Sequence, residues 1–255
     1  MQIKLLSLVG LLGLGLLTAR SQDAADDSMQ KPQKFERTIT KTVRADYLLF
    51  TPKGYKAGGE KKWPLILFLH GAGERGSDLQ KVAVHGPPKI VQTKPEFPFL
   101  VVSPQCPEGE TWSGDVLNSL LDDVLAKHAV DTNRLYLTGL SMGGFGSWTL
   151  ATQSPERWAA VAPICGGGDN LRLLLASGAR KKALQSLPVW AFHGAKDNVV
   201  KLENSEKMIE AFKKLGNTEV ELTVYPEAGH DSWTETYNNP KLYDWFLAHT
   251  RQPGN

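Results

Sequence analysis

One stretch, Leu135–Trp148, constrains the fold more than any other part of the chain. It opens with the apolar run Leu135–Leu137, which has the length and bulk of a buried strand. The pattern Gly-Leu-Ser-Met-Gly follows at residues 139–143. Glycines at both ends of such a pattern let a strand turn sharply into a helix where a Cβ would clash, and they leave the serine strained and exposed. The stretch therefore predicts a strand, a tight turn that presents Ser141, and a helix.

The rest of the chain alternates apolar runs with amphipathic segments of helical period. Nearly continuous apolar strands that alternate with helices are typical of an α/β sheet covered on both faces, with its site at the carboxyl ends of the strands. We expect antiparallel strands near the N-terminus, over Thr38–Val43 and Tyr47–Thr51, and further strands over Leu65–Leu69, Phe99–Ser103, Ala159–Pro163, Val189–Phe192 and Val220–Tyr225. The helices are expected over Val116–Leu125, Leu171–Ser177, Glu203–Leu215 and Lys241–His249.

The first 21 residues have the pattern of a secretory signal peptide. They carry Lys4, the apolar run Leu5–Leu17 and a small-x-small cleavage signal at residues 19–21. A membrane anchor needs about 20 apolar residues, which neither this run nor any other stretch supplies. We therefore expect an exported protein, secreted or periplasmic, with no membrane insertion. A polar segment without periodicity over 22–34 is expected to be a flexible tether, followed by one catalytic domain over 35–250.

Charge and motif content exclude several partners. The chain has 29 Lys and Arg and 27 Asp and Glu, and the leader contains two of the cations, Lys4 and Arg20. Nucleic acid and anionic membranes are therefore not expected as partners. No cluster has metal-ligand spacing and no phosphate-binding loop or dinucleotide fingerprint is present, so we expect neither a metal nor a cofactor.

The two cysteines, Cys106 and Cys165, do not suggest a disulfide scaffold. Each follows a predicted strand. If those strands lie three spacings apart in the sheet, about 14 Å separates the cysteines, which is too far for a bridge. We expect two free, partly buried thiols.

A serine, an acid and a histidine follow successive predicted strands. Ser141 comes first, Asp197 follows the penultimate strand, and His230 lies in a Gly-His turn after the last strand. Asp169, one strand earlier, is the rival acid, and a strand-end aspartate could merely cap the helix that starts near Leu202. Position in the chain favours Asp197.

The other five histidines have plainer interpretations. His70 and His193 end strands in front of glycine, where filling a turn is their expected role. His128 and His249 close amphipathic helices, where a cation near the C-terminus is ordinary. His85, in a His-Gly-Pro-Pro loop, is harder to set aside.

Four motifs together resemble the small secreted serine esterases of the α/β-hydrolase superfamily. They are Gly-Leu-Ser-Met-Gly-Gly-Phe-Gly, His-Gly-Ala-Lys-Asp, Ala-Gly-His-Asp-Ser-Trp and His-Gly-Ala-Gly-Glu-Arg-Gly, and the similarity covers Phe35 to His249. The nearest group is similar to feruloyl and acetylxylan esterases and polyhydroxybutyrate depolymerases, and it overlaps sequences labelled predicted peptidases or dienelactone-hydrolase-like. The order Ser, Asp, His is the one α/β-hydrolases use. Dienelactone hydrolases proper have a cysteine nucleophile, whereas this chain has Ser141.

The resemblance implies a mechanism that the residue types support. Ser141 attacks an ester carbonyl, His230 takes and returns the proton, and Asp197 orients the imidazole. The backbone N–H groups of Met142 and Ala72 are the expected oxyanion donors.

Substrate contacts are less constrained. Trp112 and Trp233 could wall an acyl or aromatic pocket or merely pack the loops. Glu74 and Arg75, beside the expected oxyanion loop, are predicted to form a mutual salt bridge.

Three functions compete. The first is an exported carboxylesterase for short acyl or phenolic esters of the feruloyl or acetyl type, either small molecules or groups linked to polysaccharides. The second is an exopeptidase or amidase of the prolyl-oligopeptidase type, against which the chain lacks room for the propeller that gates those enzymes. The third is a non-catalytic binding protein on a hydrolase scaffold, disfavoured because every triad position is filled.

Overall fold

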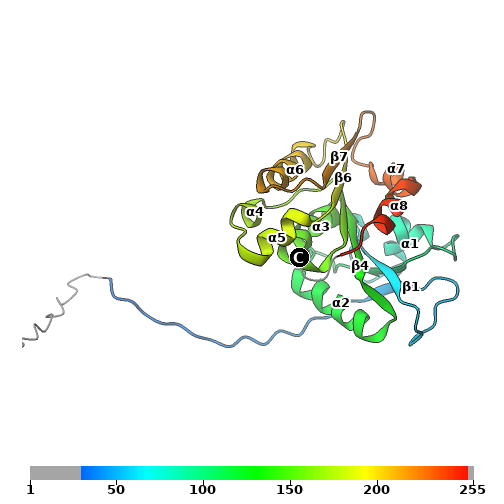
Figure 1. Cartoon of the computed structure of the whole chain (residues 1–255), viewed down its shortest axis with the longest axis horizontal. Coiled ribbons are helices and arrows are strands. Elements are labelled where there is room, and N and C mark those ends of the chain that lie inside the picture. Colours follow the sequence, from blue (N-terminus) through cyan, green and yellow to red (C-terminus); the bar gives the residue numbers. More distant parts are fainter. Residues whose placement is uncertain (1–29, 252–255) are drawn as a thin grey trace, which may run out of the picture. The chain divides into compact units, whose positions relative to one another are not determined.

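The computed structural model describes residues 30–251 of the chain (Figure 1). The leader predicted over 1–21, and the start of the tether predicted over 22–34, lie outside the described residues. Contacts divide the chain into a unit that ends at Lys41 and a unit that begins at Thr42. Residues 30–41 form no helix or strand, and their side chains are exposed. The compact unit begins at Thr42, later than Phe35, where the sequence placed the start of the domain.

Seven strands form one sheet in the part of the chain that the structure describes. Their spatial order is β1-β3-β2-β4-β5-β6-β7; β1 runs antiparallel to β3, and every other pair of neighbours is parallel. The predicted mostly parallel sheet with an antiparallel N-terminal part is confirmed. The strands are β1 (Tyr47–Phe50), β2 (Trp63–Leu69), β3 (Leu100–Pro104), β4 (Val130–Leu140), β5 (Ala160–Ile164), β6 (Val189–Gly194) and β7 (Val220–Tyr225).

Helices cover both faces of this sheet. The helices are α1 (Gly86–Ile90), α2 (Gly114–Lys127), α3 (Met142–Gln153), α4 (Leu171–Leu174), α5 (Gly178–Ser186), α6 (Glu203–Leu215), α7 (Trp233–Asn238) and α8 (Pro240–Ala248). Short 3₁₀ turns occupy Ala72–Glu74, Leu79–Val84 and Pro155–Arg157. Side chains of α2, α3, α5 and α6 join one apolar cluster, and side chains of α7 and α8 join the other.

Strand β2 shows how the sequence produces the two clusters. Its residues are all buried, and they alternate between the faces because successive side chains of a strand point in opposite directions. Leu65 and Leu67 belong to the cluster with α2 and α3, whereas Ile66 and Phe68 belong to the cluster with α8. Burying such a side chain stabilises the fold by about 1.5–3 kcal/mol, so a central strand without polar residues is expected here.

Three differences from the sequence-based expectation concern short or unpaired elements. The strand predicted over Thr38–Val43 is wrong, because the segment has no partner strand and β propensity alone forms no ladder. The looser helix predicted over Leu171–Ser177 is α4 alone, and α5 follows it as a separate helix. Helices α1 and α7 were not predicted, since each is too short to show a period.

The two cysteines are free, as expected, but both are fully buried rather than partly buried. The sheet order places β3 and β5 three positions apart, as the argument against a bridge assumed. None of the helices in residues 30–251 combines the length and the apolar composition that crossing a membrane requires.

Candidate active site

The turn between β4 and α3 holds Ser141 in a strained backbone conformation. Ser141 has φ 53° and ψ −116°, outside the regions that residues other than glycine favour. A Cβ at Gly143 would lie 1.9 Å from the carbonyl oxygen of Leu69, and one at Gly139 would lie 2.4 Å from the carbonyl oxygen of Gly143. Ser141 N–H donates to the carbonyl of Ile164 at 3.0 Å, which ties the turn to β5. Both glycines are therefore required by close backbone contacts.

A chain of hydrogen bonds joins Ser141 to two residues from later loops. His230 Nε2 lies 2.9 Å from Ser141 Oγ, and His230 Nδ1 lies 2.7 Å from Asp197 Oδ2. An ionised carboxylate can only accept, so Nδ1 carries the proton and donates to Asp197, while Nε2 accepts from the Ser141 hydroxyl. This arrangement gives Ser141 a base and gives the base an orienting partner.

The hydrogen bonds around Asp197 favour its ionised form. Its Oδ1 accepts hydrogen bonds from the backbone N–H groups of Val199 and Val200, each at 2.9 Å. Burial alone would raise the pKa of the Asp197 carboxyl, but the hydrogen bonds from His230 and from these two N–H groups hold that pKa below its usual value. The rival Asp169 is exposed, and its Oδ1 accepts from Leu171 N–H at the start of α4. The structure brings Asp197, and not Asp169, to His230.

His70 and His193 are buried and hold backbone segments together. His70 Nδ1 lies 2.6 Å from the carbonyl of Gly71, and its Nε2 accepts from Cys106 N–H at 3.0 Å. Burial lowers the pKa of His70. His193 Nδ1 lies 2.8 Å from Ser205 Oγ, and its Nε2 lies 2.8 Å from the carbonyl of Val200, the same residue whose N–H reaches Asp197. His193 thus supports the loop that presents Asp197.

His85 and His230 both contact Trp233. Trp233 packs its indole against the His230 ring, with centroids 5.3 Å apart, and against the His85 ring at 5.5 Å. Trp233 and His85 also line a separate small pocket of about 50 Å³. The structure therefore places Trp233 beside His230 but outside the pocket at Ser141.

The two expected oxyanion donors lie where the turns begin. Met142 is the first residue of α3, and Ala72 is the first residue of the turn Ala72–Glu74 that follows β2. Within the described residues, no hydrogen bond uses the backbone N–H of either one. The first N–H groups of a helix have no partner inside it, so both donors are free for a ligand.

The salt bridge predicted between Glu74 and Arg75 is wrong. Arg75 donates instead to the carbonyls of Ala72 and Glu110, at 3.0 and 3.2 Å. Glu74 turns the other way, and its carboxylate lies 3.9 Å from His85 and 4.0 Å from His70. Neighbouring residues of a tight turn project in different directions, which keeps the two charges apart. Arg75 still links the Ala72 turn to the Glu110 loop.

A pocket of about 460 Å³ opens beside Ser141 and has no charged residue in its lining. Trp112, Met142 and Phe145 provide its apolar walls, together with Thr111, Gly146 and Thr149. Trp112 is fixed by a hydrogen bond from its Nε1–H to the carbonyl of His70 at 3.1 Å. A Cβ at Gly146 would lie 2.9 Å from the Trp112 ring, so this helical glycine makes room for the indole.

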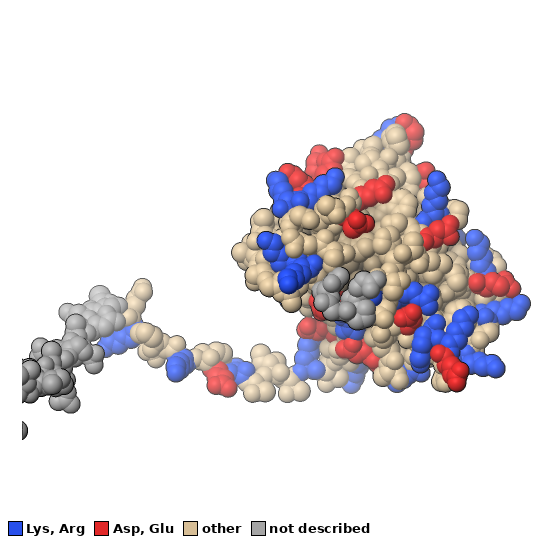
Figure 2. Space-filling model, viewed as in Figure 1, with Lys and Arg blue, Asp and Glu red and all other residues tan. Residues whose placement is uncertain are grey.

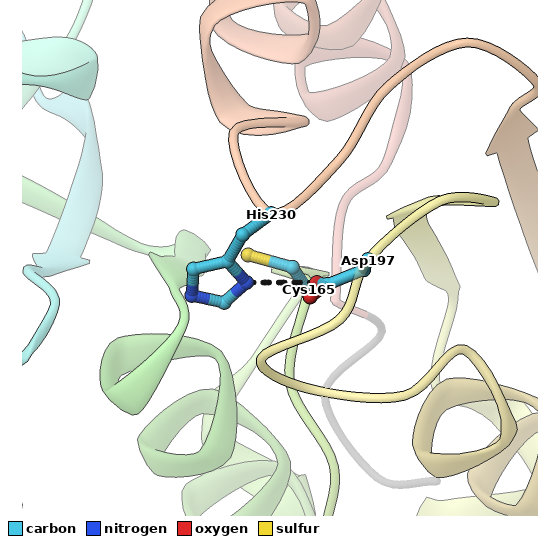
Figure 3. A group of neighbouring side chains, drawn as sticks. All are labelled: Cys165, Asp197 and His230. Atoms are coloured by element: carbon cyan, nitrogen blue, oxygen red, sulfur yellow. Dashed lines mark hydrogen bonds and ion pairs between the residues drawn. The ribbon is translucent and has the colours of Figure 1, made fainter.

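Cys165 also lies beside Asp197 and His230, which the sequence analysis did not predict. Figure 3 shows its thiol beside the hydrogen-bonded pair of Asp197 and His230, and the potential ligand atoms of all three lie within 4.8 Å of one another. Cys165 is fully buried, has φ 39°, and burial raises the pKa of its thiol to about 12. To hold a metal ion, Asp197 and His230 would have to give up their mutual hydrogen bond and Cys165 its proton. The only sequence signal was its position directly after β5.

Comparisons with known proteins agree with this architecture. The chain is 30% identical over 141 residues to a candidate carboxymethylenebutenolidase of Yersinia pestis, which covers 49% of this chain and 50% of the relative. It is 28% identical over 158 residues to a bifunctional acetylxylan esterase/xylanase of Neocallimastix patriciarum, which covers 59% of this chain and 22% of the relative. The chain thus spans half or less of the length of these curated relatives.

A solved structure of a thermostable esterase is similar in both fold and sequence. The two superpose with a TM-score of 0.66 at 32% identity, over 80% of this chain and 59% of the other. The fold is that of the α/β-hydrolases, as the sequence motifs implied. The model of one family, described as "Dienelactone hydrolase family", matches residues 30–244, most of the described sequence. The chain therefore belongs to the dienelactone hydrolase family.

Proposed function

We propose that this chain is a serine carboxylesterase that hydrolyses esters through an acyl-enzyme. The hydrogen-bonded series Ser141–His230–Asp197 at the mouth of an uncharged pocket carries the proposal. Relatives named as acetylxylan and feruloyl esterases, and a thermostable esterase of the same fold, support it.

The chemistry follows from the atoms that face one another. Ser141 Oγ forms a bond to the ester carbonyl carbon while its proton passes to His230 Nε2. The charged imidazole is stabilised by Asp197 and gives the proton to the leaving alkoxide, so an alcohol departs and an acyl-serine remains. Water then repeats the sequence on the acyl group and releases the acid, regenerating Ser141. In this proposal Ala72 and Met142 donate their N–H groups to the oxyanion.

The acyl group or the aromatic part of the substrate occupies the pocket of Trp112 and Phe145. Its volume of about 460 Å³ falls within the range of small-molecule sites, and its uncharged lining favours a neutral, apolar group. Trp233 packs against the His230 ring outside that pocket, and in this proposal it offers a second contact surface for the alcohol part. Small phenolic or short acyl esters, free or linked to a polysaccharide, fit this description.

The proposal includes export of the protein from the cell. Residues 1–21 have the charge, apolar run and cleavage signal of a signal peptide. Expression of the full chain, followed by mass measurement of the mature protein in the periplasm or medium, tests it. A protein that keeps its first residues and stays inside the cell would contradict export.

A substrate panel tests the activity. Nitrophenyl esters of increasing acyl length, methyl ferulate, acetylated xylan and an aminoacyl-anilide are compared by kcat/KM with the same preparation. We expect hydrolysis of the esters and little of the anilide, because amides are harder to cleave. Activity on the anilide alone would replace the esterase with the amidase alternative, and no activity on any substrate would favour a binding protein.

A further inference from the structure

Helix α4 presents an apolar face to solvent. Leu171, Leu174 and Leu175 are 52%, 65% and 72% exposed, while Leu173 is buried and anchors the helix. Positions i, i+3 and i+4 of a helix lie on one face, so the three exposed leucines form a contiguous ridge. A helix that packs on a protein core turns such a face inward. Here the apolar face points away from the sheet.

Four cations follow in the same stretch of chain as this ridge, and one acid, Asp169, stands at the start of α4. Residues 170–186 contain Arg172, Arg180, Lys181 and Lys182 and neither Asp nor Glu. All four side chains are exposed, and none forms an ion pair with another residue in the described range 30–251. In Figure 2, blue side chains lie over α5. We name these three leucines and four cations the leucine-cation surface.

The neighbouring helix does not neutralise this surface. Helix α6 packs against both α4 and α5, and it carries as many lysines as glutamates. One of its glutamates, Glu210, is paired with Lys214 at 2.6 Å on the same helix. The charged residues of α6 are Glu203, Glu206, Glu210, Lys207, Lys213 and Lys214. The net positive charge of the leucine-cation surface therefore remains.

We propose that the leucine-cation surface docks the protein on an anionic lipid bilayer. Leucines beside Lys and Arg are the combination that enters the boundary between headgroups and acyl chains while pairing with lipid phosphates. An anionic polysaccharide would satisfy the cations but leave the leucines in water. The balanced charge of the whole chain hides this local asymmetry, which depends on a fold that exposes the leucines. The proposal is independent of the esterase activity.

The docking surface is continuous with the candidate active site along the chain. Helix α4 follows β5 through the glycine segment 166–168, and Cys165, at the start of that segment, lies beside Asp197 and His230. Gly166 and Gly167 of this segment are buried, and only Gly168 next to α4 is exposed. Any ester dissolved in the bilayer would be concentrated near the protein.

Vesicle co-sedimentation tests the proposal with the mature chain. The probes are vesicles of phosphatidylcholine alone and of equal parts phosphatidylglycerol and phosphatidylcholine, at low and high salt. Two variants remove the two components, R172Q/R180Q/K181Q/K182Q and L171S/L174S/L175S. A matched control, K56Q/K62Q/K94Q/K241Q, removes four exposed lysines elsewhere on the surface. Circular dichroism and hydrolysis of a soluble ester report that each variant is folded.

The expected results separate the lipid surface from other occupants. The parent protein should bind the anionic vesicles and not the neutral ones, and salt should weaken binding. The charge variant should lose about fivefold in partition coefficient per cation, while the control loses far less. The leucine variant should also lose binding.

Equal losses in the control and the charge variant, or no vesicle binding by the parent, would overturn the proposal. A parent dimer that L171S/L174S/L175S converts to a monomer would instead show that a second copy covers the face, which also overturns it.

Discussion

The turn at Ser141 and the leucine-cation surface follow neighbouring strands of one sheet, yet they are built in opposite ways. On either side of Ser141, Gly139 and Gly143 stand where a Cβ would lie 2.4 and 1.9 Å from a backbone oxygen. At Gly178, the first residue of α5, a Cβ would meet nothing within 4 Å. The apolar residues of β4 are buried, whereas three of the leucines in and after α4 face solvent. One region is determined by backbone contacts, and the other keeps its outer face free for a partner.

Substitutions in the two regions should therefore affect different properties of the protein. In the turn, each position serves the backbone geometry or the chemistry, so small changes have large effects. On the leucine-cation surface the side chains are exposed, so their loss should affect binding more than stability.

The largest effect is expected from Ser141→Ala. Removing the proposed nucleophile should lower kcat/KM for a nitrophenyl ester by about 10⁴-fold or more, with the residual rate supplied by the proposed oxyanion donors. Thermal unfolding should change little, because alanine meets the same backbone strain. L171S/L174S/L175S should leave the rate on this soluble ester near that of the parent. A Ser141→Ala enzyme with substantial activity would mean that the turn does not hold the nucleophile.

Asp197→Asn should come next, with Asp169→Asn as its matched control. An asparagine can place its NH₂ toward His230 Nδ1 and stabilise the wrong tautomer, so kcat should fall by about 10³–10⁴-fold. Asp169→Asn removes only a charge at the start of α4 and should cost about twofold or less in rate. Kinetics of the two purified variants decide the assignment. The reverse ranking would move the acid to Asp169.

Gly143→Ala and Gly178→Ala compare the two regions through the backbone. At Gly143 the new methyl would overlap the carbonyl of Leu69, so we expect a loss of about 3 kcal/mol or more in the free energy of unfolding. At Gly178 only the positive φ of 56° is unfavourable, and the loss should be about 1 kcal/mol. Urea unfolding of both variants gives the two values. Equal losses of unfolding free energy in the two variants would show that the backbone around Ser141 can shift to accommodate a methyl group despite its close contacts.

Leu173→Ala and Leu174→Ala make the same comparison within one helix. Leu173 is 1% exposed and its truncation should cost about 2–4 kcal/mol, whereas Leu174 is 65% exposed and should cost about 0.5 kcal/mol or less. The free energy of unfolding from urea titration is the measurement. If Leu174→Ala destabilises the monomer as much as Leu173→Ala, its side chain is packed in solution and the leucine-cation surface is not free.

The smallest effect concerns pH and His70. Burial lowers the pKa of His70 below its usual 6.5, so the folded protein resists a proton that the unfolded chain accepts. Above about pH 6.5 the His70 side chain is neutral, and its titration does not lower the free energy of unfolding. The free energy of unfolding falls as the pH drops below that value. Urea unfolding at about pH 8 and about pH 5 should show this loss, and His70→Gln should reduce it while lowering stability at the higher pH. An unchanged pH dependence in His70→Gln would assign the loss to other groups.

Periodic segments were predictable because local physics determines them. The structure places a helix over Glu203–Leu215 and a strand over Val220–Tyr225, the ranges that the sequence predicted. The helix has an apolar face, and Gly216 ends it with φ 99°. Short elements such as α1 and α7 lack a period, and Thr38–Val43 lacks a partner, so sequence reasoning could not place them correctly.

The sequence by itself also determined the chemistry available to the protein: a serine between close-packed glycines, and aspartates and histidines after later strands. Only the tertiary structure decided which of them meet, because the order of strands in the sheet sets distances between loops that are remote in the chain. It joins His230 to Asp197 rather than Asp169, puts Cys165 behind that pair, and turns Glu74 toward His85 instead of Arg75. It also leaves Leu174 exposed while burying Leu173. Residue types and spacings specify each element, but contacts between elements depend on how the whole chain packs.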